Sequence, residues 1–197
     1  ARIIVSNSKL KNDYKKNILF IHDKNPRKLL SDVSNKFYKL KPNNIIAVTG
    51  TNGKTSVANF YEQILTLNNK KVASIGTLGV LSKKIKITTN NTTIDPVSTH
   101  KILQDLKKSK IENVILEASS HGLKQHRLNN IKFKTAIFTN LSRDHLDYHK
   151  TFKDYLNSKL ILFNKLVINN GNIIFDEKIK ETNQLNNISQ KRKLKKY

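Results

Sequence analysis

The sequence predicts an α/β fold in which helices flank a mainly parallel sheet. Short apolar runs of strand length recur along the chain, and amphipathic stretches separate several of them, as expected of βαβ units. One of these runs leads through a glycine-containing loop directly into a helical pattern. The predicted strands cover residues 45–48, 72–75, 114–116, 136–138 and 173–175.

Helices are predicted where apolar residues recur at helical spacing. One helix is expected over residues 56–67, after the glycine-containing loop. Another is expected from Pro96 to residue 110, because proline is favoured at the first helical position. Pro42 marks a boundary, since the pattern before it differs. The elements expected there are strands at residues 3–5 and 18–21 and a helix over residues 27–38.

The composition narrows the classes of function. A chain of 197 residues fits one domain, or one domain and part of another. Its formal net charge of +23 would suit a nucleic-acid partner, but the lysines are spread along the whole chain, so we expect no nucleic-acid function. The basic residues 190–197 are expected to form a solvated end.

The residue types that are missing add further expectations. Without cysteine the chain has no disulfides and no cysteine-based metal site or nucleophile. It also lacks methionine, even at position 1, which suggests a processed, shortened or incomplete chain. No apolar run approaches the roughly 20 residues of a membrane helix, and we therefore expect a cytoplasmic protein with no membrane partner.

The most specific motif is TGTNGKT at residues 49–55, between an apolar strand and a helix. Backbone N–H groups of such a P-loop-type turn bind phosphate oxygens, and the positive end of the following helix helps them. A simple glycine-rich turn is the less favoured alternative. Position 48 is Val where the common P-loop has Gly, so the motif is a variant. The predicted nucleotide-binding residues are Gly50, Thr51, Asn52, Gly53, Lys54, which can reach the β and γ phosphates, and Thr55, whose hydroxyl can ligate Mg²⁺.

Further motifs follow this loop in a fixed order. They are IGTLG (75–79), NTTIDP (91–96), EASSHGLKQHR (117–127), FTNLSRDHLDYH (138–149) and YLNSKLILF (155–163). The loop alone is similar to both the Mur ligases and folylpolyglutamate synthase, whereas the whole series resembles the MurE type of Mur ligase. The resemblance implies that residues 44–197 are an incomplete central ATP-binding domain. It also implies that residues 1–43 are the end of an N-terminal domain for the uridine nucleotide, and that the C-terminal ligase domain is absent.

The resemblance implies an activity as well. Enzymes of this type are ATP-dependent ligases that join a third amino acid, diaminopimelate or lysine, to UDP-N-acetylmuramoyl-L-alanyl-D-glutamate in peptidoglycan synthesis, through an acyl phosphate. The implied cofactors are ATP and two Mg²⁺ ions, and a monomer is expected. The sequence leaves the choice of amino acid open, and we expect the isolated chain to be inactive. The alternatives are a non-catalytic nucleotide-binding fragment and a folylpolyglutamate synthase-like ligase.

Carboxylate and imidazole groups in these motifs are candidate metal ligands. Glu117 ends an apolar strand, where a carboxylate can ligate a metal at the mouth of a parallel sheet. The resemblance makes Glu117, with Thr55, a Mg²⁺ ligand and makes His145 a ligand of the second ion. His145 and His149, at i and i+4, could by themselves also form a zinc pair. The resemblance instead gives His149 a structural role, which we also expect for His22 and His100.

Lys159 is a cation within an apolar helical stripe. Phe152, Leu156 and Phe163 share its predicted helix face, so its amine either reaches water by snorkelling or is buried. The resemblance implies that CO₂ carbamylates Lys159 and that the carbamate helps to hold the second Mg²⁺. Burial favours this chemistry because it favours the neutral amine. The predicted catalytic residues are therefore Lys54, Glu117, His145 and Lys159.

The remaining predicted site residues follow from the resemblance alone. Asn140 matches a position that binds ATP. The chain departs from the family pattern at Lys150, where Gly is common, and at Phe175, where Asn is common. The positions that match residues for the sugar-peptide substrate are Thr92, Thr93, Ser119, Gln125 and Arg127.

Overall fold

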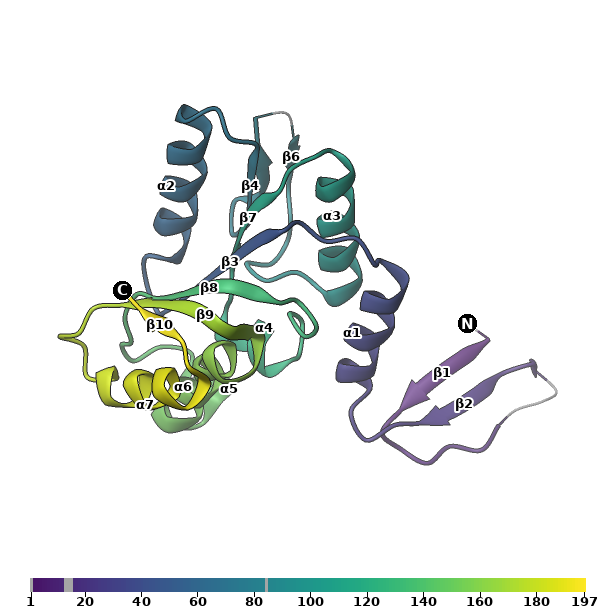
Figure 1. Ribbon diagram of the computed structural model, residues 1–197. Coiled ribbons are helices and arrows are strands. Elements are labelled where there is room, and N and C mark those ends of the chain that lie inside the picture. The colour runs from purple at the N-terminus through teal and green to yellow at the C-terminus, as the bar shows by residue number, and fades with distance from the viewer. Residues whose placement is uncertain (1, 13–15, 84) are drawn as a thin grey trace.

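The computed structural model describes residues 2–12, 16–83 and 85–197, and its main body is a twisted sheet with helices on both sides (Figure 1). The strand order is β10-β9-β8-β3-β7-β4-β5-β6. The strands are β3 (Asn44–Thr49), β4 (Val72–Gly76), β5 (Gly79–Ser82), β6 (Ile85–Ile87), β7 (Asn113–Glu117), β8 (Phe133–Phe138), β9 (Val167–Phe175) and β10 (Lys195–Lys196).

The pairing of these strands confirms the predicted α/β class. Strands β4, β7, β3, β8, β9 and β10 run parallel to their neighbours, and β5 and β6 add an antiparallel edge beside β4. All five predicted strands lie within β3, β4, β7, β8 and β9. The edge strands β5 and β6 were not predicted, because GVLS in β5 does not alternate apolar and polar residues and IKI in β6 alternates over only three residues.

The helices divide between the two faces of the sheet. Figure 1 shows α2 (Lys54–Leu67) on one face and α3 (Pro96–Lys108) on the other. Alternate residues of β3 explain this layering, since Val48 packs with Ala58 of α2 while Ala47 belongs to the larger core on the opposite side. The other helices of the main body are α4 (Ser120–Lys124), α5 (Leu146–His149), α6 (Phe152–Ile161), the π-helix η2 (Leu162–Leu166) and α7 (Thr182–Arg192).

The described part of the N-terminal segment lies beside the main body and does not join the main sheet. Strands β1 (Ile3–Ser6) and β2 (Leu19–His22) pair in parallel apart from the main sheet, and α1 (Pro26–Phe37) lies between them and α3 (Figure 1). Ser31 Oγ donates to the Asn129 carbonyl (3.0 Å), which ties α1 to the main body. The predicted strands and helix before Pro42 are thus confirmed to within one residue at each end. The assignment of residues 1–43 to a separate domain stays a prediction.

The C-terminal segment has more regular secondary structure than the sequence predicts. Residues 190–197 were predicted to be solvated, but α7 continues to Arg192 and β10 joins the sheet edge next to β9. Leu194 is only 7% exposed, and this one apolar residue holds the basic segment against the core. The prediction is therefore confirmed for the side chains, which are exposed apart from Arg192 and Leu194, whereas the helical and strand structure of this segment was not predicted. In the described part of the chain no helix combines the length and the apolar character that a bilayer crossing requires.

Arg192 fastens this end to the π-helix, so we expect Arg192→Ala to lower the free energy of unfolding by about 2 kcal/mol. The guanidinium donates to the carbonyl oxygens of Phe163, Asn164 and Val167 (the first at 3.2 Å and the last at 2.8 Å) and to Asn169 Oδ1 (2.9 Å). Urea unfolding would measure the loss.

The neighbouring Lys191 is exposed, and Lys191→Ala is the matched control that should leave the midpoint unchanged. Arg192→Lys should restore only part of the stability, because an ammonium lacks the planar fork that reaches several carbonyls. Equal midpoints for Arg192→Ala and the wild type would contradict the prediction.

Candidate functional site

The turn between β3 and α2 has the backbone conformation that its two glycines permit. Gly53 has φ of 83° directly before the first residue of α2, and Gly50 has φ of 150°. A Cβ on Gly50 would lie 1.9 Å from Thr139 Oγ1 and 3.1 Å from the backbone nitrogen of Asn140. The carboxyl ends of β3 and β8 therefore approach so closely that only glycine fits at position 50.

Asn140 shapes this turn from the neighbouring strand end. Its carbonyl accepts from the Thr51 N–H (2.9 Å), and its Oδ1 accepts from the Asn52 N–H (3.0 Å). Thr139 Oγ1 donates to the carbonyl of Asn52 (2.6 Å). The structure thus places Asn140 beside the predicted nucleotide-binding residues, where it fixes the path of their backbone.

Two lysines converge on one carbonyl oxygen of the turn. Lys54 Nζ donates to Gly50 O (3.0 Å) and Thr51 O (2.8 Å), and Lys159 Nζ donates to Gly50 O (2.7 Å) from α6. The Lys159 side chain is 1% exposed, and its amine lies 4.4 Å from the centre of the Tyr155 ring. The two predicted catalytic lysines, which are far apart in the sequence, are neighbours in the fold.

Burial lowers the pKa values of both lysine amines. Burial and, to a smaller extent, the nearby positive charge of Lys54 together lower the pKa of Lys159 to about 7, while Asp144 acts in the opposite direction. Burial also lowers the pKa of Lys54, while Glu117 and Asp144 act in the opposite direction. Near neutral pH a large share of Lys159 is therefore the uncharged amine.

Glu117 lies at the end of β7, next to α2. Its Oε2 accepts from the hydroxyls of Thr55 (2.9 Å) and Thr77 (3.2 Å), and its Oε1 accepts from the Thr77 N–H (3.0 Å). Glu117 is 2% exposed, and a Cβ on Gly76 would lie 2.1 Å from Oε1. The structure therefore brings Glu117 and Thr55 into direct contact, as predicted, and adds Thr77, which the sequence reasoning missed although it lies within the IGTLG motif.

His145 is an exposed residue with φ of 52°. Its ring centre lies 5.0 Å from that of His121 and 6.2 Å from that of Tyr155, whose ring also faces the Lys159 amine. The preceding residue, Asp144, is close enough to influence the pKa of both Lys54 and Lys159. His145 thus belongs to the same region as the two lysines, although it makes no direct bond to them.

Tyr155 is a further site residue that the sequence reasoning did not single out. It is buried, and its hydroxyl lies 3.1 Å from Thr51 Oγ1. With its ring beneath Lys159 and its hydroxyl at the turn, Tyr155 joins α6 to the nucleotide loop. The only sequence signal was its position one helical turn before Lys159.

The other predicted structural histidines take different positions. His149 is buried, with Nε2 2.9 Å from Ser120 Oγ and Nδ1 3.4 Å from Asp154 Oδ2, so it is held inside the fold. His100 is also buried, and burial, with a smaller contribution from Lys41, lowers its pKa to about 4. Within residues 2–12, 16–83 and 85–197, no three His, Asp or Glu side chains gather closely enough to hold a metal without other ligands.

The predicted substrate residues form one connected network beside Glu117. Thr93 Oγ1 donates to the Glu117 carbonyl (2.7 Å) and accepts from the Ser119 N–H (2.9 Å). Arg127 donates to the Thr93 carbonyl (2.6 Å) and, at 3.1 and 2.8 Å, to Gln125 Oε1. The hydroxyls of Thr92 and Thr77 lie 3.0 Å apart, which links this network to the Glu117 carboxylate.

The protonation of Lys159 makes stability depend on pH in a defined window. Its folded-state pKa of about 7 lies below its ordinary value of 10.5, so between these pH values the unfolded chain binds more protons and the free energy of unfolding rises with pH. Lys159→Met is expected to remove up to about 5 kcal/mol of this rise. Urea unfolding at several pH values in CO₂-free buffer would measure it.

The exposed Lys165 provides a matched control, since Lys165→Met should leave the pH profile unchanged. His100, with its pKa lowered to about 4, titrates below this window and should contribute equally in all three proteins. Lys54 contributes a residual slope, because its pKa is also lowered. Parallel profiles for the wild type and Lys159→Met would refute the assignment.

Comparisons with known proteins show to which family of enzymes this chain is similar. The profile of the Mur ligase middle domain matches residues 48–197. The UDP-N-acetylmuramoyl-L-alanyl-D-glutamate–2,6-diaminopimelate ligase of Rickettsia montanensis is 45% identical over 176 residues, which are 86% of this chain and 37% of that protein. The ligase of the same name from Brucella melitensis is 44% identical over 147 residues, or 75% of this chain and 30% of that protein.

Solved structures agree with the sequence relatives. A ligase structure of the same name superposes with a TM-score of 0.81 at 28% identity, covering 98% of this chain and 39% of that chain. Escherichia coli FolC in complex with ADP shares the fold with a TM-score of 0.65 at 18% identity, covering 87% of this chain and 46% of that one. The present chain thus spans between 30% and 46% of the length of these proteins. From the match over residues 48–197, the chain belongs to the Mur ligase family.

Proposed function

We propose that this chain is the ATP-binding part of a ligase that adds diaminopimelate to UDP-N-acetylmuramoyl-L-alanyl-D-glutamate. The single observation that carries the proposal is the convergence of Lys54 and Lys159 on the Gly50 carbonyl, beside the Thr55–Glu117 contact. The names of the relatives at about 45% identity support the choice of amino acid and substrate. Because the chain covers 37% of the Rickettsia montanensis relative, the complete reaction is proposed for a protein of that relative's extent.

The turn fits the phosphates of a nucleotide. Gly50 and Gly53 give it a path that no other residue could follow without strain, and the 14-residue helix α2 directs its amino end at the turn. Lys54 now satisfies its charge with the carbonyls of Gly50 and Thr51. When phosphates arrive, its amine can exchange these neutral acceptors for charged oxygens, which form stronger hydrogen bonds.

The oxygens around Glu117 fit Mg²⁺. A carboxylate and a threonine hydroxyl are ligands that this ion accepts, and Thr55 Oγ1 and Glu117 Oε2 lie 2.9 Å apart. Mg²⁺ keeps several waters, which agrees with the small number of protein oxygens here. Bound Mg²⁺ supplies charge neutralisation for phosphoryl transfer, and Thr77 keeps the carboxylate in place through its N–H group.

The burial of Lys159 supports the proposal that this residue is carbamylated. The neutral amine, which the pKa of about 7 makes available, forms an N–C bond to CO₂ and releases a proton. The carbamate anion replaces a positive charge next to Lys54 by a negative one, so the repulsion between the two side chains becomes an attraction. We propose His145 and this carbamate as ligands for a second Mg²⁺. The cytoplasmic location and the monomeric state of the protein remain expectations.

The network beside Glu117 is the proposed site for the sugar-peptide substrate. Thr92, Thr93, Ser119 and Gln125 present hydroxyl and amide groups around Arg127, whose guanidinium can pair with a phosphate or carboxylate. Bound ATP supplies the phosphoryl group that a substrate carboxylate takes. The role of this chain is to hold that carboxylate and the phosphates in line and to exclude competing water.

Nucleotide binding by the purified chain tests the proposal. Calorimetric titration with ATP should give saturable 1:1 binding that depends on Mg²⁺, and NMR under ¹³CO₂ should show a carbamate signal that Lys159→Met removes. A non-catalytic nucleotide-binding fragment would bind ATP without the carbamate signal. Absence of ATP binding, together with affinity for single-stranded DNA that falls steeply with salt, would overturn the proposal in favour of a nucleic-acid binder.

A further inference from the structure

A cavity lies at the end of the sheet opposite the nucleotide loop. It has a volume of about 390 Å³ and an apolar floor formed by Val72, Ile85 and Ile111. Val72 and Ile85 begin β4 and β6, and Ile111 precedes β7, so the cavity faces the amino ends of the parallel strands. Figure 1 shows that α2 leads away from the nucleotide loop towards this end. The volume falls within the range of small-molecule sites.

The rim of this cavity is strongly basic. Lys70, Lys71 and Lys83 line it, all three are exposed, and none of their ammonium groups has a hydrogen bond or ion pair within the described chain. The described lining contains no Asp or Glu. Two carboxylates belong to residues next to the lining: Glu62 accepts from Oγ1 of the lining Thr66 (3.1 Å), and Glu112, which follows Ile111, pairs with Lys107 (2.5 Å). In the part of the chain that the structure describes, neither is paired with a lysine of the rim.

Neutral hydrogen-bonding groups complete the wall. The hydroxyl and amide side chains that also line the cavity belong to Thr66, Asn69, Ser82 and Ser109. An apolar floor favours a ligand with an apolar body, since burying it releases water from both surfaces. Lysines without partners favour an anionic head, which would satisfy charges that the fold leaves unpaired.

We propose that this cavity binds a small organic anion, with an apolar body on the floor and a carboxylate, sulfonate or phosphate at Lys70, Lys71 and Lys83. The site is separate from the nucleotide loop and does not rest on the proposed ligase function. Because α2 extends from Lys54 to Leu67 and Thr66 lines the cavity, one rigid helix joins the two sites.

The probe for the test is 8-anilinonaphthalene-1-sulfonate, whose fluorescence rises in apolar surroundings. Titration of the chain should show saturable 1:1 binding. The triple variant Lys70→Glu, Lys71→Glu, Lys83→Glu should weaken it at least about tenfold, since each lysine contributes attraction to the sulfonate. Thr66→Trp, which fills the cavity without changing charge, should weaken it as well.

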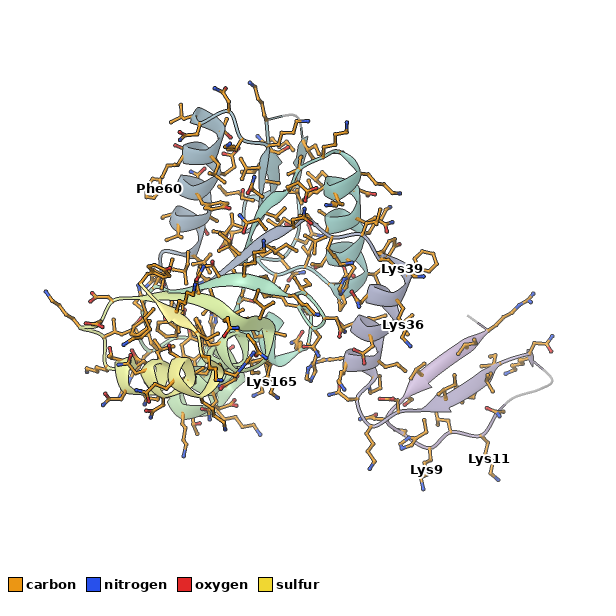
Figure 2. All side chains as sticks on the ribbon, viewed as in Figure 1. Lys9, Lys11, Lys36, Lys39, Phe60 and Lys165 are labelled. Atoms are coloured by element: carbon orange, nitrogen blue, oxygen red, sulfur yellow. The ribbon has the colours of Figure 1, made fainter. Side chains whose placement is uncertain are left out.

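A second triple variant, at lysines distant from the cavity, tests whether the change in net charge alone weakens binding of the probe. Lys36, Lys39 and Lys165 are exposed and lie away from the α2 end of the sheet (Figure 2), and their joint replacement by Glu changes the net charge equally. This control should keep the affinity within about twofold. Lys54→Ala should also leave it unchanged, so failure of this site and failure of the nucleotide site are distinguishable.

A binding-site map keeps the proposal testable if a triple variant does not fold. Phe60 points away from the main body in Figure 2, and with Ile64 and Leu67 it forms an exposed apolar face of α2 that could also attract the probe. In ¹H–¹⁵N spectra of the unmodified chain, the largest shifts should fall on Lys70, Lys83 and Ile111. Largest shifts on the Phe60 face, or equal loss of affinity in both triple variants, would overturn the proposal.

Discussion

Replacing Lys54 with alanine is expected to weaken MgATP binding by this chain at least about a hundredfold. Hydrogen bonds to charged groups contribute about 1.5–3 kcal/mol each, and Lys54 can reach two phosphates, so loss of its amine removes at least two factors of about ten. The contribution is large here because Lys54 is partly desolvated, as the direction of its pKa shift shows. Isothermal titration of the two proteins in the same buffer would measure the ratio.

The control for this substitution must remove a lysine without touching the turn. Lys165→Ala does so, since that side chain is exposed on the π-helix, and it should bind MgATP like the wild type. The cooperative thermal unfolding of Lys54→Ala should be retained, because the hydrogen bonds that Lys54 Nζ makes within the described chain go to carbonyls of the same loop. Unchanged affinity in a folded Lys54→Ala protein would show that the turn does not hold the nucleotide phosphates.

Gly50→Ala is expected to destabilise the fold by about 3 kcal/mol and to remove nucleotide binding with it. The new methyl group would meet Thr139 Oγ1 at 1.9 Å, and φ of 150° is unfavourable for alanine. Thr139 cannot move freely, since its hydroxyl donates to the Asn52 carbonyl (2.6 Å). Relief of the clash therefore displaces the loop itself. Urea unfolding and MgATP titration would show both effects.

Gly53→Ala separates this clash from a general intolerance of the turn. Gly53 also has a positive φ, 83°, but the nearest atom to its added Cβ would be 3.8 Å away, so a loss of only about 1 kcal/mol is expected. Adding Thr139→Ala to Gly50→Ala should recover part of the stability by removing the closest contact. Equal losses for Gly50→Ala and Gly53→Ala would show that the approach of β3 and β8 is not tight.

The central strands could be predicted because buried strands consist mainly of apolar residues. In a parallel sheet covered on both faces, strands such as β3 and β7 read as continuous apolar runs. The edge carries no such signal, since β6 is largely exposed and β10 consists of two lysines. Backbone pairing with β9 places β10, and the buried Leu194 next to it was hidden among basic residues.

The site divides in the same way. Residues within the TGTNGKT motif could be predicted together, because a strand, a tight turn and a helix form them locally. The contacts of Lys159 with Gly50 and of Tyr155 with Thr51 join residues more than a hundred positions apart. Those contacts depend on how α6 packs against the sheet, which periodicity does not describe. Thr77 could not be predicted, because an uncharged threonine in a short motif has no property in the sequence that marks it as a partner of Glu117.

The two lysine amines on the Gly50 oxygen also bear on the choice of buffer, since Lys54 and the protonated fraction of Lys159 repel each other. Phosphate and sulfate ions are small enough to enter where a nucleotide's phosphates would rest, and they would ease the mutual repulsion of Lys54 and Lys159. Such salts would act as weak competitors, so dissociation constants obtained in them would be inflated. A zwitterionic buffer with chloride as the only counterion contains no oxyanion that competes with the nucleotide for these amines.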